Sequence, residues 1–179
     1  DKAVAFITVP IFTRMLSTSD YGVITTYLSW VSILTVVITL SLGNSIRTAV
    51  IDFKDDTNGY MSSVFTLGTI SATMISAIIC IASLSMEVDH SNFKVILCCC
   101  AQAYATSIIQ AIQWKYMLDV RYLARTALQS IPNIVAVILS VFMINIMKDN
   151  KYLGRVYAGT VVYFLLSIVY LIYYWKKGK

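Results

Sequence analysis

The chain has 179 residues, of which 58% are hydrophobic and only 13% are charged, and its formal net charge is +5. A soluble domain carries about 25% charged residues and could not cover so much apolar surface, so the composition indicates an integral membrane protein and excludes a soluble one. The basic residues lie singly between apolar runs, which argues against nucleic acid as a partner and points to membrane topology as their role.

Charge-free windows predict six membrane helices, because one span needs about 20 apolar residues. The first window, between Lys2 and Arg14, has about half that length, so we expect a first helix that is truncated at its N-terminal side. Pro132 lies inside the fifth window, where it should kink the helix. The expected helices cover residues 1–16, 21–42, 60–86, 94–115, 125–147 and 154–175.

The basic residues between these helices predict which side of the membrane each connection faces. Segments 43–59 and 115–125 and the C-terminal tail hold eight basic residues, against five in the connections that face the other way. The positive-inside rule therefore places the first three in the cytoplasm. Segments 17–20, 87–92 and 148–155 are then external.

Each of the last five helices carries one stripe of polar residues at steps of three and four. On the second and third helices the stripe consists mainly of serine and threonine, which fits close helix packing as well as a cavity wall. The fourth helix carries glutamines, which are bulkier than close packing requires and fit a water-filled cavity better. We therefore expect a polar cavity lined by Gln102, Gln110 and Gln113, together with Asn133 and Tyr163 from the next two helices.

No arrangement of residues in the sequence indicates an enzyme, a metal site or a bound cofactor. The only histidine, His90, lies in a polar loop, so neither a catalytic triad nor a metal cluster can form around it. The adjacent residues Cys98, Cys99 and Cys100 point about 100° apart on a helix and cannot chelate one ion. We interpret them as small packing residues. Transport and scaffolding are the functions left open.

Four stretches of the chain resemble one family of membrane transporters. Residues 6–22 read FITVPIFTRMLSTSDYG, residues 42–47 read LGNSIR, and residues 152–159 read YLGRVYAG. Residues 1–3 read DKA, where the family more often has a small polar residue in place of the Asp. In their order and spacing these stretches resemble the polysaccharide and O-antigen repeat-unit flippases. These are the Wzx-like members of the multidrug/oligosaccharidyl-lipid/polysaccharide exporter superfamily.

The resemblance implies a transporter of two six-helix lobes around a central cavity, which works by alternating access in the cytoplasmic membrane. Residues 1–179 then correspond to the N-terminal lobe, and we expect about a dozen preceding residues and the whole second lobe to be absent from this sequence. The implied substrate is a polyprenyl-diphosphate-linked oligosaccharide used for surface polysaccharide. Membrane lipids and the polysaccharide polymerase machinery are the implied partners. No cofactor is expected, and the sequence does not identify the coupling ion, for which Na⁺ and H⁺ are the candidates.

Two other functional classes stay open at this point. A drug/cation antiporter of the same superfamily needs a carboxylate inside the membrane, and Asp1 is the one candidate in the sequence. A non-transporting scaffold subunit would need no polar stripes that converge on one axis.

Charge near the first helix adds a further expectation. Lys2 lies roughly 18 Å along a helix from Arg14, which places it near the bilayer midplane, where a lysine costs about 2.5–3.5 kcal/mol. Lys2 therefore either pairs with a residue of the second lobe or belongs to a cationic path. From the family resemblance we expect that path to consist of Lys2, Arg14 and Arg47 and to follow the lipid diphosphate.

Overall fold

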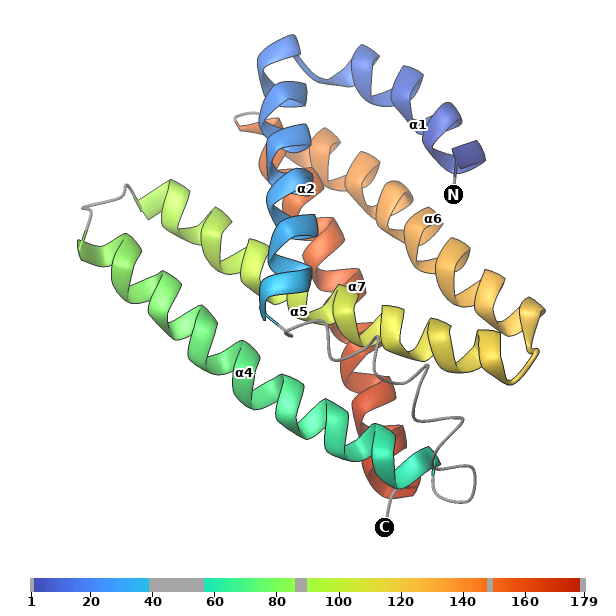
Figure 1. Cartoon of the computed structure of the whole chain (residues 1–179). Helices are drawn as coiled ribbons and strands as arrows, with labels where there is room; N and C mark the ends of the chain where they lie inside the picture. The colour runs from blue at the N-terminus through green and yellow to red at the C-terminus, as the bar shows by residue number, and fades with distance from the viewer. Residues whose placement is uncertain (1, 39–56, 86–89, 148–149, 178–179) are drawn as a thin grey trace.

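The computed structural model describes residues 2–38, 57–85, 90–147 and 150–177, and every regular element within them is an α-helix (Figure 1). Five of these helices are long and apolar enough to cross a membrane, namely α2 and α4 to α7. The all-helical membrane fold expected from the composition is thereby confirmed. In chain order the helices are α1 (Lys2–Met15), α2 (Thr18–Ile38), α4 (Thr57–Ser85), α5 (His90–Leu118), α6 (Tyr122–Ile146) and α7 (Lys151–Lys177).

The helices extend past the charges that bracket the apolar windows. Lys94 and Lys115 both lie inside α5, and Arg155 lies inside α7. Backbone hydrogen bonding does not stop where the hydrocarbon layer ends, and long basic side chains near a helix end can reach the headgroups. The charge-free windows therefore measure the hydrocarbon part of each helix, whereas the helix itself is longer. The last part of the expected second helix, 39–42, lies outside the described residues.

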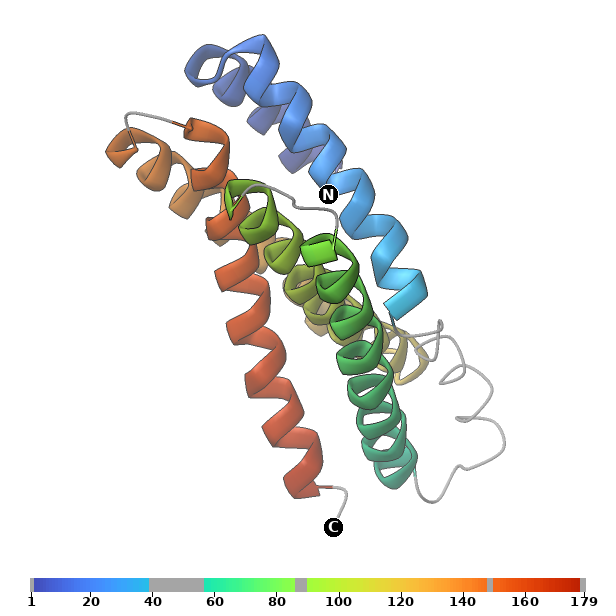
Figure 2. The ribbon, with the colours of Figure 1, turned by 90° about the vertical axis from the view of Figure 1, so that its left-hand side faces the viewer.

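Helix α5 is the central element of the bundle. It packs against α2, α4, α6 and α7, with α2 on one side of it and α7 on the other (Figure 2). Half of its membrane window is buried, against 17–28% for the other four long helices. By contrast, the backbone of α1 approaches only α2 and α6 among the described elements. A charge in the middle of a helix that packs against four neighbours is costly, and α5 has none between Lys94 and Lys115.

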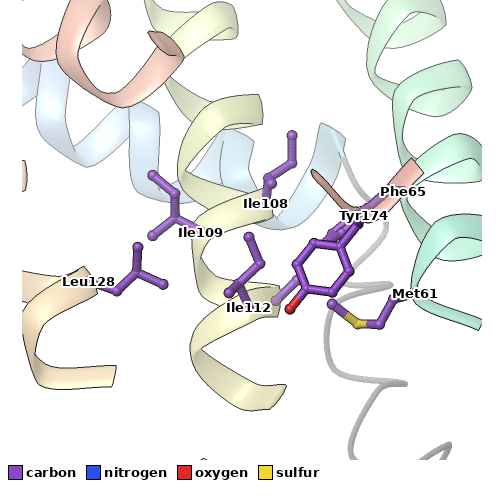
Figure 3. Packing of buried hydrophobic residues seen from close by; sticks show 8 residues of the cluster. Met61, Phe65, Ile108, Ile109, Ile112, Leu128 and Tyr174 are labelled. Atoms are coloured by element: carbon purple, nitrogen blue, oxygen red, sulfur yellow. The ribbon is translucent and has the colours of Figure 1, made fainter. Parts of the chain in front are cut away.

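One apolar cluster joins four of the helices at the end of the bundle where α7 terminates (Figure 3). Phe65 of α4 meets the ring of Tyr174 of α7 edge to face, with 5.7 Å between ring centroids. The ammonium group of Lys115 lies 4.9 Å from the centre of the same Tyr174 ring, an arrangement that stabilises a cation in an apolar setting. The buried members are Met61, Phe65, Ile108, Ile109, Ala111, Ile112, Leu128 and Tyr174.

The turn between α1 and α2 is held by a capping box. The Ser17 hydroxyl accepts a hydrogen bond of 3.1 Å from the backbone N–H of Asp20 and donates one of 2.7 Å to its carboxylate. The same carboxylate accepts the backbone N–H of Ser17 at 3.3 Å. Both N–H groups would otherwise lack a helical partner. The polar turn expected between the first two helices thus has a defined local geometry.

The hydroxyl stripes serve different purposes on different helices. On α2, the hydroxyls of Thr25, Ser29 and Ser32 each donate to a backbone carbonyl of the preceding turn, and all three residues are exposed. Such local bonding satisfies a hydroxyl without any neighbouring helix. On α4, by contrast, the Thr69 hydroxyl lies 2.5 Å from that of Tyr104 on α5. Thr69 of the α4 stripe therefore contributes to packing, whereas Thr25, Ser29 and Ser32 of the α2 stripe lie open.

Candidate functional site: a polar pocket around Arg155

A pocket of 190 Å³ lies among α2, α5, α6 and α7. Both α2 and α6 pack against α5 and α7, but the backbones of α2 and α6 do not approach each other. Side chains from all four helices therefore meet in the space between them. Its polar lining residues are Tyr27, Ser32, Gln102, Thr106, Asn133, Arg155 and Tyr163.

Arg155 is the charged group of this pocket. It lies inside the membrane-length span of α7, and its guanidinium donates a 3.0 Å hydrogen bond to the hydroxyl of Ser140 on α6. The guanidinium carbon also lies 4.9 Å from the centre of the Phe12 ring of α1. Among the described residues, no carboxylate forms an ion pair with Arg155. Its charge is thus held by one hydroxyl and one aromatic face, and most of its N–H donors are left for a ligand.

Two glycines of α7, Gly154 and Gly159, let neighbouring groups come close to α7 on either side of Arg155. A Cβ atom on Gly154 would lie 3.1 Å from the backbone nitrogen of Ile144, so this glycine lets α7 approach α6 closely. A Cβ atom on Gly159 would lie 3.3 Å from Oε1 of Gln102. Gly159 therefore leaves room for the Gln102 carboxamide, which projects from α5 toward α7.

Gln102 belongs to a small hydrogen-bonded network beside Arg155. The hydroxyl of Tyr27 donates to Oε1 of Gln102 at 2.8 Å and lies 3.2 Å from the hydroxyl of Thr160. The Thr160 hydroxyl lies 3.3 Å from the same Oε1 atom. Nε2 of Gln102 takes no part in these bonds and forms none with another described residue. Nε2 and the Arg155 guanidinium therefore offer N–H donors to a ligand rich in acceptors, such as a phosphate or a sugar.

Three of the glutamine, asparagine and tyrosine residues expected at a polar cavity do line this pocket, namely Gln102, Asn133 and Tyr163. Gln110 is exposed and Gln113 is half-buried, and neither is among the residues that line the pocket. Gln110 lies eight residues beyond Gln102, which at about 100° per residue turns it by roughly 80° around the axis of α5. This rotation carries Gln110 away from α2 and α7.

Of the basic residues of the expected cationic path, Arg14 does not line the pocket. Arg14 is exposed and lines a separate polar hollow of 410 Å³ with Asn145 and Lys151. Lys2 begins α1, and Arg47 lies outside the described residues. The hollow lies near the pocket, since Lys151 precedes Arg155 by one turn of α7.

Two residues of the site were missed by reasoning from the sequence, Arg155 and Tyr27. Arg155 was interpreted as a charge at a helix boundary, although the stretch Leu153-Gly154-Arg155 had been singled out as a motif. The useful signal was the pair of glycines that flank the arginine at positions 154 and 159. Tyr27 carried no such signal, because one tyrosine among 12 in a membrane protein resembles any other.

Five membrane-length helices define a multi-pass helical membrane protein. Comparison with known families makes the assignment more specific. The chain belongs to the polysaccharide biosynthesis protein family, whose model matches residues 1–179. No curated protein and no solved structure matches the chain significantly. Family membership assigns it to the synthesis or transport of polysaccharide.

Proposed function

We propose that this protein is a flippase that moves polyprenyl-diphosphate-linked oligosaccharide across the cytoplasmic membrane for surface polysaccharide biosynthesis. Its family supports a role in polysaccharide biosynthesis, and its multi-pass helical fold favours transport over catalysis. A sugar headgroup loses its hydrogen bonds to water when it enters hydrocarbon, at a cost of several kcal/mol for each unpaired polar group. A protein pocket that replaces those bonds removes most of this barrier.

The observation that carries the proposal is Arg155 within the polar pocket. Arg155 lies one turn inside α7, which begins at Lys151. An arginine within a membrane span is costly unless it pairs, reaches the headgroups or faces a cavity, and a purely structural role would favour a nearby carboxylate to offset that cost. The pocket instead supplies amide and hydroxyl groups from Gln102, Asn133 and Tyr163. A cation surrounded by hydrogen-bonding groups suits a ligand that combines phosphate with sugar.

The size of the pocket bears on how the ligand is held. Ligand pockets usually measure about 300–1,000 Å³, whereas this pocket measures 190 Å³. It therefore accommodates only part of an oligosaccharide, and the remainder extends out between α2 and α6. The hydroxyl stripe of α2, formed by Thr25, Ser29 and Ser32, continues from the pocket along that side. In a two-lobed transporter this surface would face the central cavity, and alternating access would expose it to each side in turn.

The charge distribution favours an anionic cargo over a cationic drug. An antiporter of drugs or cations exchanges its cargo for Na⁺ or H⁺ at a carboxylate inside the membrane. The acidic residues that the structure describes are Asp20, in the first turn of α2, and Asp119, just after α5. Neither lies in the middle of a span. Coupling of the flippase to Na⁺ or H⁺ remains part of the proposal.

Substitution of Arg155 in the full-length protein tests this function. Arg155→Ala should lower the rate at which the protein moves lipid-linked oligosaccharide in proteoliposomes by about 10-fold or more, because a hydrogen bond to a charged group contributes about 1.5–3 kcal/mol. Arg155→Lys should retain part of the rate, since lysine keeps the charge but loses the planar donor fork.

Lys176→Ala is the matched control, because Lys176 is an exposed cation at the other end of α7. It should leave transport unchanged. Wild-type transport by Arg155→Ala at an equal protein level would rule the proposal out. Export of a cationic dye that depends on Asp1 would favour the antiporter instead.

A further inference from the structure

An apolar groove of 840 Å³ lies on a different side of α2 from the polar pocket. Residues of α2, α4 and α5 form it, and its walls are almost entirely hydrocarbon. We name it the α2–α4–α5 groove. Its lining residues are Ser19, Gly22, Val23, Thr26, Tyr27, Trp30, Leu34, Ile79, Val95, Ile96 and Cys99.

Tyr27 separates the groove from the polar pocket and borders both. Its ring forms part of the groove, while its hydroxyl is bonded to Gln102 and lies within hydrogen-bond distance of Thr160 on the pocket side. Only 5% of Tyr27 is exposed, so little open path leads past it. A substrate whose headgroup occupies the pocket therefore could not place its own tail in the groove without displacing Tyr27. The occupant of the groove has to be a different molecule.

We propose that the α2–α4–α5 groove binds one acyl chain of a membrane phospholipid. From Ser19 to Leu34 the groove follows α2 for roughly 22 Å, which matches half of the total bilayer thickness of about 40–45 Å. That length suits the headgroup layer and the hydrocarbon of one leaflet. A bound chain would pack against the Tyr27 ring from the side opposite to Gln102.

The residues at the mouth of the groove suit a phosphate group. Ser19 presents an exposed hydroxyl there, and the exposed Lys94 directly precedes Val95 and Ile96, two lining residues of α5. A lysine at a membrane boundary typically reaches into the headgroup layer. The cation and the hydroxyl thus lie at the end of the groove where a phospholipid headgroup would be.

The lining of the groove argues against a protein helix as the occupant. Helices in membranes pack through small residues, which let their backbones approach closely. The groove is lined by bulky side chains such as Trp30, Leu34 and Ile79, and its one glycine, Gly22, lies near the mouth. A flexible acyl chain can follow such an uneven surface, whereas a rigid helix would leave voids.

Photolabelling of the full-length protein tests the proposal directly. The protein would be reconstituted in vesicles of equal parts phosphatidylethanolamine and phosphatidylglycerol, with a trace of either lipid carrying a diazirine in one acyl chain. After illumination, labelled peptides are mapped by mass spectrometry. Label should concentrate on residues 19–34 and 95–99, about 10-fold above the equally apolar and exposed outer face of α4 at Ile70, Met74 and Ile78.

A groove-filling variant provides the second measurement. A Cβ atom on Gly22 would meet no atom within 4 Å, and Gly22 lines the groove, so the larger side chain of Gly22→Phe should occupy part of the groove. It should lower the labelling of residues 95–99 by about 10-fold. Val36→Phe is the matched control, because Val36 lies on the same helix, is 57% exposed and does not line the groove. That control should label like the wild type.

Three results would overturn the proposal. The first is wild-type label spread in proportion to exposure. The second is unchanged labelling in Gly22→Phe. The third is displacement of the label by unlabelled polyprenyl phosphate but not by an equal excess of unlabelled phospholipid, which would assign the groove to a polyprenyl tail. None of these measurements depends on transport, so the test stands apart from the flippase function.

Discussion

Gly154 and Gly159 shape the polar pocket in different ways, although they lie close together on α7. The neighbour of Gly154 is the backbone of α6 at 3.1 Å, so any side chain there must push two helices apart. The neighbour of Gly159 is the end of a flexible side chain, the carboxamide of Gln102, at 3.3 Å. Displacing the backbone of a packed helix costs more free energy than rotating a flexible side chain. The first position therefore governs helix packing, and the second governs the geometry of the pocket.

Gly159→Ala should impair transport more than stability. The added methyl group should shift the Gln102 carboxamide and weaken its bond to Tyr27, and such a bond contributes about 0.5–1.5 kcal/mol. We expect a several-fold lower rate of oligosaccharide transport in proteoliposomes, with a thermal midpoint close to that of the wild type. Gly22→Ala is the control, since its Cβ would meet no atom within 4 Å. A Gly159→Ala variant that transports normally but unfolds early would contradict this role.

At the scale of the helix, the end of α5 shows how the chain turns without a glycine. The N–H of Arg121 donates to the carbonyl of Tyr116 at 2.9 Å, and that of Val120 donates to Met117 at 3.2 Å. This pair of bonds is the Schellman motif, which places one residue in the left-handed region. Here that residue is Val120, with φ of 58°. A β-branched residue is strained in this conformation.

Val120→Gly should therefore stabilise the protein by about 1 kcal/mol, because glycine adopts a positive φ without a Cβ clash. Little packing is lost, since Val120 is 64% exposed. The expected result is a higher thermal midpoint for the full-length protein in detergent. Val36→Gly removes the same side chain from the interior of a helix and should lower the midpoint. If Val120→Gly also lowers the thermal midpoint, backbone strain at Val120 does not destabilise the protein.

At the scale of the helix, polar stripes did not suffice to predict which residues form the pocket. A stripe identifies one face of a helix, but it does not identify which neighbour that face meets. The hydroxyls of α2 stay open beside the pocket, whereas Thr69 of α4 bonds to Tyr104 of α5. Two similar patterns thus gave two different environments, because the Thr69 hydroxyl faces α5 whereas Thr25, Ser29 and Ser32 face away from the neighbouring helices.

For the whole molecule, the two ends of the bundle give a prediction about topology. The turn between α1 and α2 and the start of α7 lie at one end, and the start of α4 and the end of α7 lie at the other (Figure 1). From the distribution of basic residues we expect the first end to be external. In a background without native cysteines, Asn92→Cys should react with an impermeant thiol reagent in intact cells. Asn58→Cys should react only after permeabilisation, and the reverse pattern would invert the proposed orientation.

The sequence by itself determined the membrane character, the all-helical fold and the resemblance to polysaccharide flippases that family membership now supports in its broader form. These properties depend on composition and on runs of apolar residues, which local chemistry alone dictates: every span must satisfy its own backbone hydrogen bonds in lipid, and only a helix does so. Gln102, Asn133 and Tyr163, which line the polar pocket, were likewise predicted from their polarity on otherwise apolar helices.

Only the tertiary structure decided which polar residues meet. It brought Arg155 into the pocket with Gln102, left Gln110 exposed on the same helix, and placed Tyr27 between a polar pocket and an apolar groove. The physical reason is that a helical repeat fixes directions around one axis, whereas a site depends on how several axes cross. The angles at which helices cross depend on close contacts between them, such as that of Gly154 with the backbone of α6. The periodicity of a single helix does not predict such contacts.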